Sequence, residues 1–168
     1  HIDADGFFVA ETERGICRVI CFSPRHDLTL AEMDVADIAR VVDVWRDQYA
    51  ELGARDDIGH VQIFENKGAL MGCSNPHPHG QIWASRAVPT EVAIEDHHQR
   101  AYHARHHRPM LAAVAEREAE SGERIVAINT DWIALVPFWA KWPYELLVLP
   151  RAHARHLLDL DDARRASL

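Results

Sequence analysis

The stretch at residues 72–83, with the sequence GCSNPHPHGQIW, constrains this chain more than any other part of it. His77, His79 and Gln81 occupy alternate positions, so in an extended backbone their side chains leave the same face. The two prolines beside these histidines exclude a helix, and the second cannot donate a hydrogen bond to a neighbouring strand. The pattern therefore predicts the start or the edge of a strand that presents imidazoles for nucleophilic attack or metal binding.

Alternating and helical hydrophobic periods along the rest of the chain predict an α+β fold, with antiparallel strands and helices packed on one face. A capping box at Thr29 to Glu32 is expected to open the first helix, which runs to about Leu52. A soft boundary between two parts of the chain is expected near residues 109–122. The predicted strands are 16–22, 60–65, 80–85, 124–129, 132–136 and 145–149, and the other helices are 91–107, 110–120 and 159–168.

Composition narrows the class of protein. A formal charge of -8 gives no reason to expect a nucleic-acid or anionic-membrane partner. No apolar run approaches the roughly 18 residues that a membrane helix needs, and no secretion signal is present. Cys17, Cys21 and Cys73 show no disulfide-like spacing, so we expect reduced thiols and a cytoplasmic protein. Because the sequence begins at His1, we expect the true start to lie upstream or to have been trimmed.

His79 is the candidate nucleophile. A neutral imidazole nitrogen can attack phosphorus and form a covalent nucleotidyl-histidine, provided that a carbonyl or carboxylate holds the other ring nitrogen. We expect Gly80 to leave room for a bulky phosphate beside the ring. The alternative is that His79 is only a metal ligand, and the local pattern favours neither interpretation.

Polar groups around His79 suit a phosphate. Gln81 lies on the same predicted face and can donate its amide to a nonbridging phosphate oxygen without exchanging a proton. The backbone of Gly72, Cys73 and Ser74 offers N–H donors, and Ser74 adds a hydroxyl. A small-residue loop is more often a plain turn, but the proximity of His79 favours a substrate-binding role.

The sequence GCSNPHPHGQIWA at residues 72–84 resembles the active-site signature of the galactose-1-phosphate uridylyltransferase family. The flanking sequences VQIFENKG at 61–68 and VICFSPRH at 19–26 agree with it, and the resemblance runs from about Arg14 to about Leu160. It implies a duplicated histidine-triad-like fold. Residues 1–108 would form the first repeat without its N-terminal part, and residues 109–168 would begin the second.

The resemblance also implies an activity in galactose metabolism. UMP would be exchanged between UDP-glucose and galactose 1-phosphate by a ping-pong route, because His79 falls on the histidine that becomes uridylylated. A histidine-triad hydrolase has a further histidine where this chain has Gln81, and glutamine suits an enzyme that must keep its covalent intermediate. Asn66 matches a nucleotide contact of the family.

The same resemblance implies two metals. His26 and His77 match two ligands of a zinc site whose other ligands form a Cys-x-x-Cys pair upstream of this region. Glu95 matches a carboxylate ligand of a second metal, iron, whose histidine partners would lie beyond Leu168. Read from the residues alone, Glu95 is a surface carboxylate early in a helix, where it complements the helix dipole.

Two other functions stay open at this point. One is a related nucleotidyltransferase or phosphorylase that acts on an ADP-sugar or a dinucleotide. The other is a non-catalytic half that binds metal or stabilises a partner chain. The family resemblance implies a homodimer, and the absent upstream part implies that a chain supplying the N-terminal half is the other expected partner.

Overall fold

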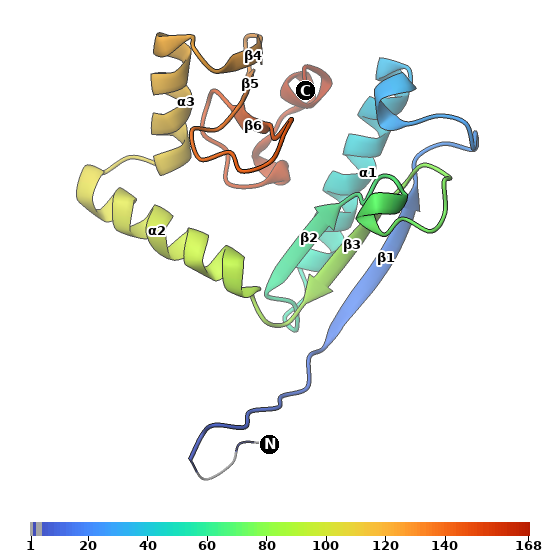
Figure 1. Cartoon of the computed structure of the whole chain (residues 1–168), viewed down its shortest axis with the longest axis vertical. Coiled ribbons are helices and arrows are strands. Elements are labelled where there is room, and N and C mark those ends of the chain that lie inside the picture. The colour runs from blue at the N-terminus through green and yellow to red at the C-terminus, as the bar shows by residue number, and fades with distance from the viewer. Residues whose placement is uncertain (1, 3–4) are drawn as a thin grey trace. The chain divides into compact units, whose positions relative to one another are not determined.

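The computed structural model describes residue 2 and residues 5–168, which form two compact units, His1–Pro89 and Thr90–Leu168. Each unit contains a three-stranded antiparallel sheet and its own helices (Figure 1). The α+β class predicted from the sequence is confirmed. No helix in the described part of the chain is both long and apolar enough to cross a membrane.

The sheet of the first unit has the order β1-β3-β2. Its strands are β1 (Gly15–Cys21), β2 (His60–Phe64) and β3 (His79–Ser85), close to the predicted ranges. The central strand β3 pairs with both neighbours, so its backbone is held on two sides. His79 is the first residue of this strand, and its position is therefore tied to the most constrained element of the unit.

Successive residues of β3 serve opposite faces of the sheet. Ile82 and Ala84 are buried with Leu52 of helix α1 (Val35–Gly53), which crosses one face of the sheet (Figure 1). The alternate residues lie on the other face, where Trp83 is 54% exposed and Val19, opposite Gln81 on β1, is 66% exposed. This period of two separates a packed face from an open face that carries His79 and Gln81.

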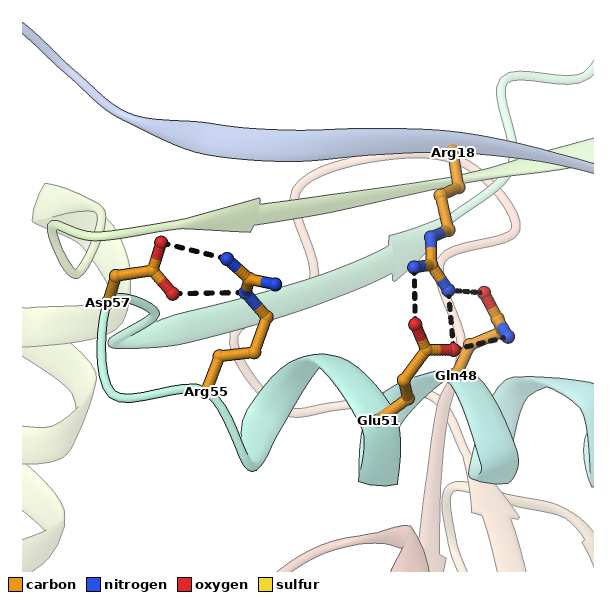
Figure 2. Close-up of polar contacts among 5 residues, drawn as sticks. All are labelled: Arg18, Gln48, Glu51, Arg55 and Asp57. Carbon is orange, nitrogen blue, oxygen red and sulfur yellow. Dashed lines mark hydrogen bonds and ion pairs between the residues drawn. The ribbon is translucent and has the colours of Figure 1, made fainter.

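A polar cluster ties β1 to α1 (Figure 2). The two terminal nitrogens of Arg18 donate to the Glu51 carboxylate at 2.8 and 2.6 Å, and Arg18 also donates to the side chain of Gln48. Between α1 and β2, Arg55 donates to Asp57 at 3.0 and 3.1 Å. A two-pronged arginine–carboxylate pair fixes direction as well as distance, so the Arg18–Glu51 pair sets how α1 lies on β1.

The predicted start of the first helix is wrong, although its capping box is present. The Glu32 carboxylate accepts the Thr29 backbone N–H at 3.0 Å, but the box caps only a short 3₁₀ turn, η1 (Leu30–Glu32). Met33 then adopts an extended conformation and is buried against Phe22, with 6% of its surface exposed. Burial of this side chain takes the chain out of the helix, and α1 begins only after Asp34.

The second unit contains a sheet of order β4-β5-β6 over a core formed by Ala115, Ile133, Leu135 and Leu149. The hairpin predicted at residues 124–136 is confirmed. The last helix begins later than predicted, at Asp162, with the Asp161 side chain accepting the Arg164 N–H. The elements are α2 (Thr90–His106), α3 (Met110–Ser121), β4 (Ile125–Ile128), β5 (Trp132–Leu135), β6 (Leu147–Pro150), η3 (Leu157–Asp159) and α4 (Asp162–Ala166).

The unit to which helix α2 belongs differs from the prediction. The sequence assigned it to residues 1–108, but by packing it belongs to the second unit, where it contacts α3. The helix breaks at His107, whose φ is 54°, and this break is the clearest local boundary signal in the region. A break between two helices does not have to coincide with a boundary between cores, and here the boundary lies at Pro89. The assignment of histidine-triad-like repeats stays a prediction.

Candidate active site

The imidazole of His79 is held by its neighbour in the loop before β3. Its Nδ1 lies 2.7 Å from the backbone carbonyl oxygen of His77. Because a carbonyl can only accept, Nδ1 carries the proton and Nε2 of the neutral ring keeps its lone pair. The expectation that a carbonyl or carboxylate orients this ring is confirmed, and the half-buried His79 has the tautomer of a nucleophile.

The loop that approaches His79 is folded back on itself. It contains a short 3₁₀ turn, η2 (Ala69–Met71), followed by Gly72 at a left-handed φ of 81° that favours glycine. The Cys73 thiol then donates to the Asn75 carbonyl at 3.0 Å, and the Asn75 side chain accepts the His77 N–H at 3.1 Å. These bonds fix the loop immediately before the residue whose carbonyl holds His79.

The loop encloses a cavity of about 400 Å³, a volume typical of small-ligand sites. Five residues singled out from the sequence lie in its wall: Asn66, Cys73, Ser74, His77 and His79. The structure therefore brings together the candidate nucleophile, the residue matched to a nucleotide contact and the polar loop. Ser74 is exposed, so its hydroxyl can reach a ligand.

Among the wall residues that were not identified as site residues from the sequence, three precede the loop segment that begins at Asn66. Leu28 and Thr29 follow β1, and Glu65 follows β2. Thr29 was interpreted only as a helix cap and Glu65 only as the end of a strand. For Glu65 the available signal was its position, since it directly follows β2, which flanks β3 in the sheet.

Two predicted substrate-binding residues lie outside the cavity wall. Gln81 stands two residues along β3 from His79, on the same open face, between Val19 and Phe64 in the strand register. Gly72 adjoins the wall through its left-handed turn. A ligand that reaches Gln81 must therefore extend from the cavity over the open face of the sheet.

The expected role of Gly80 is wrong. A Cβ atom at this position would lie 2.8 Å from the Phe22 ring and 3.2 Å from the Phe64 carbonyl oxygen. The free space beside Gly80 is thus filled by Phe22 on the packed face, and the His79 ring lies on the opposite face. Because successive residues of a strand face opposite sides of the sheet, Gly80 is needed for the close packing of Phe22. It provides no space for a phosphate beside the His79 ring.

The two predicted zinc ligands are adjacent. Nδ1 of His26 lies 2.9 Å from Nδ1 of His77, and the ring centroids are 4.7 Å apart. Convergent imidazole nitrogens are the donors that zinc prefers, so the pair fits part of a zinc site. Residue 2 and residues 5–168 contain no group of three or more histidine, cysteine, aspartate or glutamate side chains that could complete it.

Glu95, the predicted ligand of a second metal, is an exposed residue of α2 in the other unit. It joins no group of three candidate ligands in the part of the chain that the structure describes. The nearby His97 and His98 stack edge to face, with centroids 5.5 Å apart.

Two family models match nearly the whole chain. The galactose-1-phosphate uridyl transferase N-terminal domain matches residues 1–89, and the C-terminal domain of the same enzyme matches residues 95–168. The division between the two matches agrees with the division between the two packed units.

Several relatives carry the same name. The galactose-1-phosphate uridylyltransferase of Haemophilus influenzae is 50% identical over 98% of this chain and 47% of its own length. The enzyme of Rattus norvegicus is 47% identical over 96% of this chain and 42% of its own length. The chain therefore spans about half the length of the curated relatives it matches.

Solved structures agree with this relationship. A uridylyltransferase structure is 29% identical and covers 92% of this chain and 48% of its own, with a TM-score of 0.86. An ADP-glucose phosphorylase from Arabidopsis thaliana with bound ADP-glucose is 26% identical and covers 90% and 47%, with a TM-score of 0.81. Family matches, relatives and fold all point the same way, and the chain belongs to the galactose-1-phosphate uridylyltransferase family.

Proposed function

We propose that this chain exchanges UMP between UDP-glucose and galactose 1-phosphate through a covalent uridylyl group on His79. The observation that carries the proposal is the 2.7 Å bond from His79 Nδ1 to the His77 carbonyl at the wall of the cavity. In the neutral form of the ring, this bond orients the imidazole and leaves the lone pair on Nε2, which is what attack on phosphorus requires.

In the first half-reaction, the Nε2 lone pair forms a bond to the α-phosphorus of UDP-glucose. The bond from that phosphorus to the bridging oxygen breaks, and glucose 1-phosphate leaves with the electron pair. Because the leaving group is a phosphate, it departs without an acid to protonate it. The Nδ1 proton stays on the ring and is shared with the His77 carbonyl, which stabilises the positive charge on the uridylylated imidazole.

In the second half-reaction, a phosphate oxygen of galactose 1-phosphate attacks the same phosphorus. The phosphorus–nitrogen bond breaks, UDP-galactose leaves, and Nε2 regains its lone pair. Gln81 donates its amide to a nonbridging oxygen in both steps, while Ser74 and the backbone of Gly72 and Cys73 hold the phosphates. Asn66 contacts the nucleotide from the cavity wall.

The test is to mix the purified chain with UDP-glucose in the absence of acceptor and to measure intact and peptide masses. We expect one uridylyl adduct on His79 that is absent in His79→Ala. The matched control is His60→Ala, because His60 lies on β2 on the same open face, opposite Ser85, and is expected to leave the adduct unchanged. A folded, zinc-supplied sample without an adduct would remove the claim that this chain acts alone, and an adduct that persists in His79→Ala would contradict the proposal.

A second candidate donor is ADP-glucose, because a structural neighbour of this chain is an ADP-glucose phosphorylase with bound ADP-glucose. The same experiment with ADP-glucose separates the two, since an adenylyl adduct has a different mass from a uridylyl adduct. Faster adduct formation with UDP-glucose supports the first proposal, and faster formation with ADP-glucose supports the second.

We also propose that His26 and His77 hold zinc, supported by the 2.9 Å approach of their Nδ1 atoms. When bound, zinc supplies a fixed anchor for the loop that ends in the His77 carbonyl. Competition with a chromophoric chelator is expected to show weaker zinc binding in His26→Ala and His77→Ala than in the His60→Ala control. Equal affinity in all three would exclude this pair as ligands. Glu95 alone does not fit an iron site, so no step depends on iron.

For the assembly, we propose a cytoplasmic enzyme that works as a homodimer or together with a chain that supplies an N-terminal half. The free cysteines support a reducing compartment. The coverage of about half of each relative supports the need for further protein. If this chain is a non-catalytic half, adduct formation on His79 will appear only when the complementary segment is added.

A further inference from the structure

Cys21 of β1 stands directly opposite His79 of β3 in the antiparallel register. One residue further along, the Phe22 N–H donates to the Pro78 carbonyl at 2.9 Å, which makes Phe22 and Pro78 a hydrogen-bonded pair. Because hydrogen-bonded and non-hydrogen-bonded pairs alternate along an antiparallel ladder, Cys21 and His79 form a non-hydrogen-bonded pair. In such pairs the Cα atoms are only about 4.5 Å apart and opposite side chains are at their closest.

Both side chains also lie on the same side of the sheet. The odd-numbered residues of β1 are exposed on the open face, and Cys21 is among them. His79 and Gln81 share that face on β3. The thiol of Cys21 is therefore the lateral neighbour of the candidate nucleophile on the β1 side.

A neighbouring side chain can affect the orientation of the imidazole, because its one hydrogen bond does not fix the whole ring. The bond from Nδ1 to the His77 carbonyl determines the tautomer, but the ring can still swing about that contact. A side chain of two heavy atoms directly across the ladder limits this swing without covering Nε2. We expect a methyl group at this position to leave the ring more room and a larger, branched side chain to leave it less.

We infer that Cys21 is a positioning residue for His79, which keeps the imidazole in the orientation that aims Nε2 at the substrate phosphorus. The inference rests on the proposed function in taking His79 as the nucleophile. It assigns the thiol a steric role that depends on its size, with no bond made or broken at sulfur.

Cys17 provides a matched control on the same strand. It is an exposed cysteine on the same face and is also in a non-hydrogen-bonded position, but it stands opposite Trp83. Any effect of losing or enlarging an exposed thiol on β1 will appear at both positions. An effect on the nucleophile will appear only at Cys21.

The experiment measures the rate at which diethyl pyrocarbonate modifies each histidine of the folded chain, resolved by peptide mass. Serine, alanine and leucine replace Cys21 in one set of variants and Cys17 in the other, with His60 on the same face as internal reference. Relative to His60, we expect Cys21→Ala and Cys21→Leu to change the His79 rate by at least about threefold, and Cys21→Ser to stay near wild type because its size is similar. The Cys17 variants are expected to leave the ratio unchanged.

Uridylylation provides the second measurement. In Cys21→Ala, the maximal rate of adduct formation from UDP-glucose is expected to fall while the half-saturating concentration stays constant, because binding does not depend on ring orientation. If Cys21→Leu does not fold, methyl methanethiosulfonate can enlarge Cys21 in the folded Cys17→Ser/Cys73→Ser protein.

Unchanged His79 reactivity in the Cys21 variants would overturn the inference, and so would an equal change in the Cys17 variants. The proposed function fails in a different way. A wild-type chain that forms no adduct but shows Cys21-dependent His79 reactivity would remove the proposed transfer and retain the positioning role.

Discussion

At the scale of single residues, Gly80 allows β3 to pack closely on one face of the sheet while it carries His79 on the other. The Phe22 ring and the Phe64 carbonyl occupy the space where a Cβ atom would lie, so β3 can approach both neighbours at full register. The next residue back is His79, whose ring lies on the other face. A shift of the backbone at Gly80 therefore moves the candidate nucleophile directly.

We predict that Gly80→Ala destabilises the chain by about 1–3 kcal/mol, because the added methyl overpacks the contact with Phe22. Urea unfolding measures the change. The control is Gly53→Ala near the end of α1, where nothing lies within 4 Å of the new methyl. That substitution is expected to stabilise by about 0.5–1 kcal/mol through helix propensity. Equal effects at both positions would contradict the steric account.

The sequence predicted the local part of the site well. His79 and Gln81 share one face of β3, and the proline pattern correctly placed the start of a strand at this point, although His77 lies in the bend before it. It could not predict the partners that approach from elsewhere. The cavity wall at Thr29 and the pairing of Cys21 with His79 both depend on strand register, which a single sequence does not specify.

At the scale of elements, the pair of Arg18 and Glu51 fixes α1 on β1 (Figure 2). The hydrogen bond from Arg18 holds the pKa of the Glu51 carboxyl below its usual range. The folded state therefore favours the ionised carboxylate. This contribution to stability is present above the unfolded-state pKa and is lost as the pH falls through the lower pKa of the folded state.

We accordingly predict that the difference in unfolding free energy between wild type and Glu51→Gln is constant between about pH 6 and 8 and shrinks below about pH 4. Urea titrations at a series of pH values measure this difference. Glu120→Gln, at an exposed carboxylate of α3, serves as the control for removing one carboxylate elsewhere on the surface. A Glu51→Gln difference that persists unchanged at low pH would refute the assignment.

Element boundaries show where local signals stop being sufficient. The capping box at Thr29 formed as predicted, but burial of Met33 limited it to a single 3₁₀ turn. Helix α2 has the predicted extent, but its packing partner in the second unit could not be read from its own sequence. In both cases a tertiary contact decided what the local pattern left open.

At the scale of the whole molecule, each unit has its own clusters of buried apolar side chains. Leu52 and Ile82 are fully buried in the first unit, and Ile133 and Leu135 are fully buried in the second. Each of these clusters draws its members from one unit only. The two sheets therefore have separate sources of hydrophobic stabilisation.

We predict that Leu52→Ala and Ile133→Ala each cost about 2–5 kcal/mol, and that each loss is concentrated in one unit. Amide hydrogen exchange resolved by peptide is the measurement. Leu52→Ala is expected to reduce protection mainly in β1–β3, and Ile133→Ala mainly in β4–β6. A uniform loss across the chain for either variant would show that the two cores unfold as one cooperative unit.

The alternation along β3 has a consequence for genetics. A variant at Ile82 or Ala84 disturbs the packed face, so cells carrying it are expected to contain less of the protein, because quality control removes unfolded chains. A variant at His79 or Gln81 leaves that packing in place and is expected to leave protein abundance normal while specific activity falls. Neighbouring codons for one short strand thus separate into two classes of allele, one that lowers the amount of protein and one that lowers its activity.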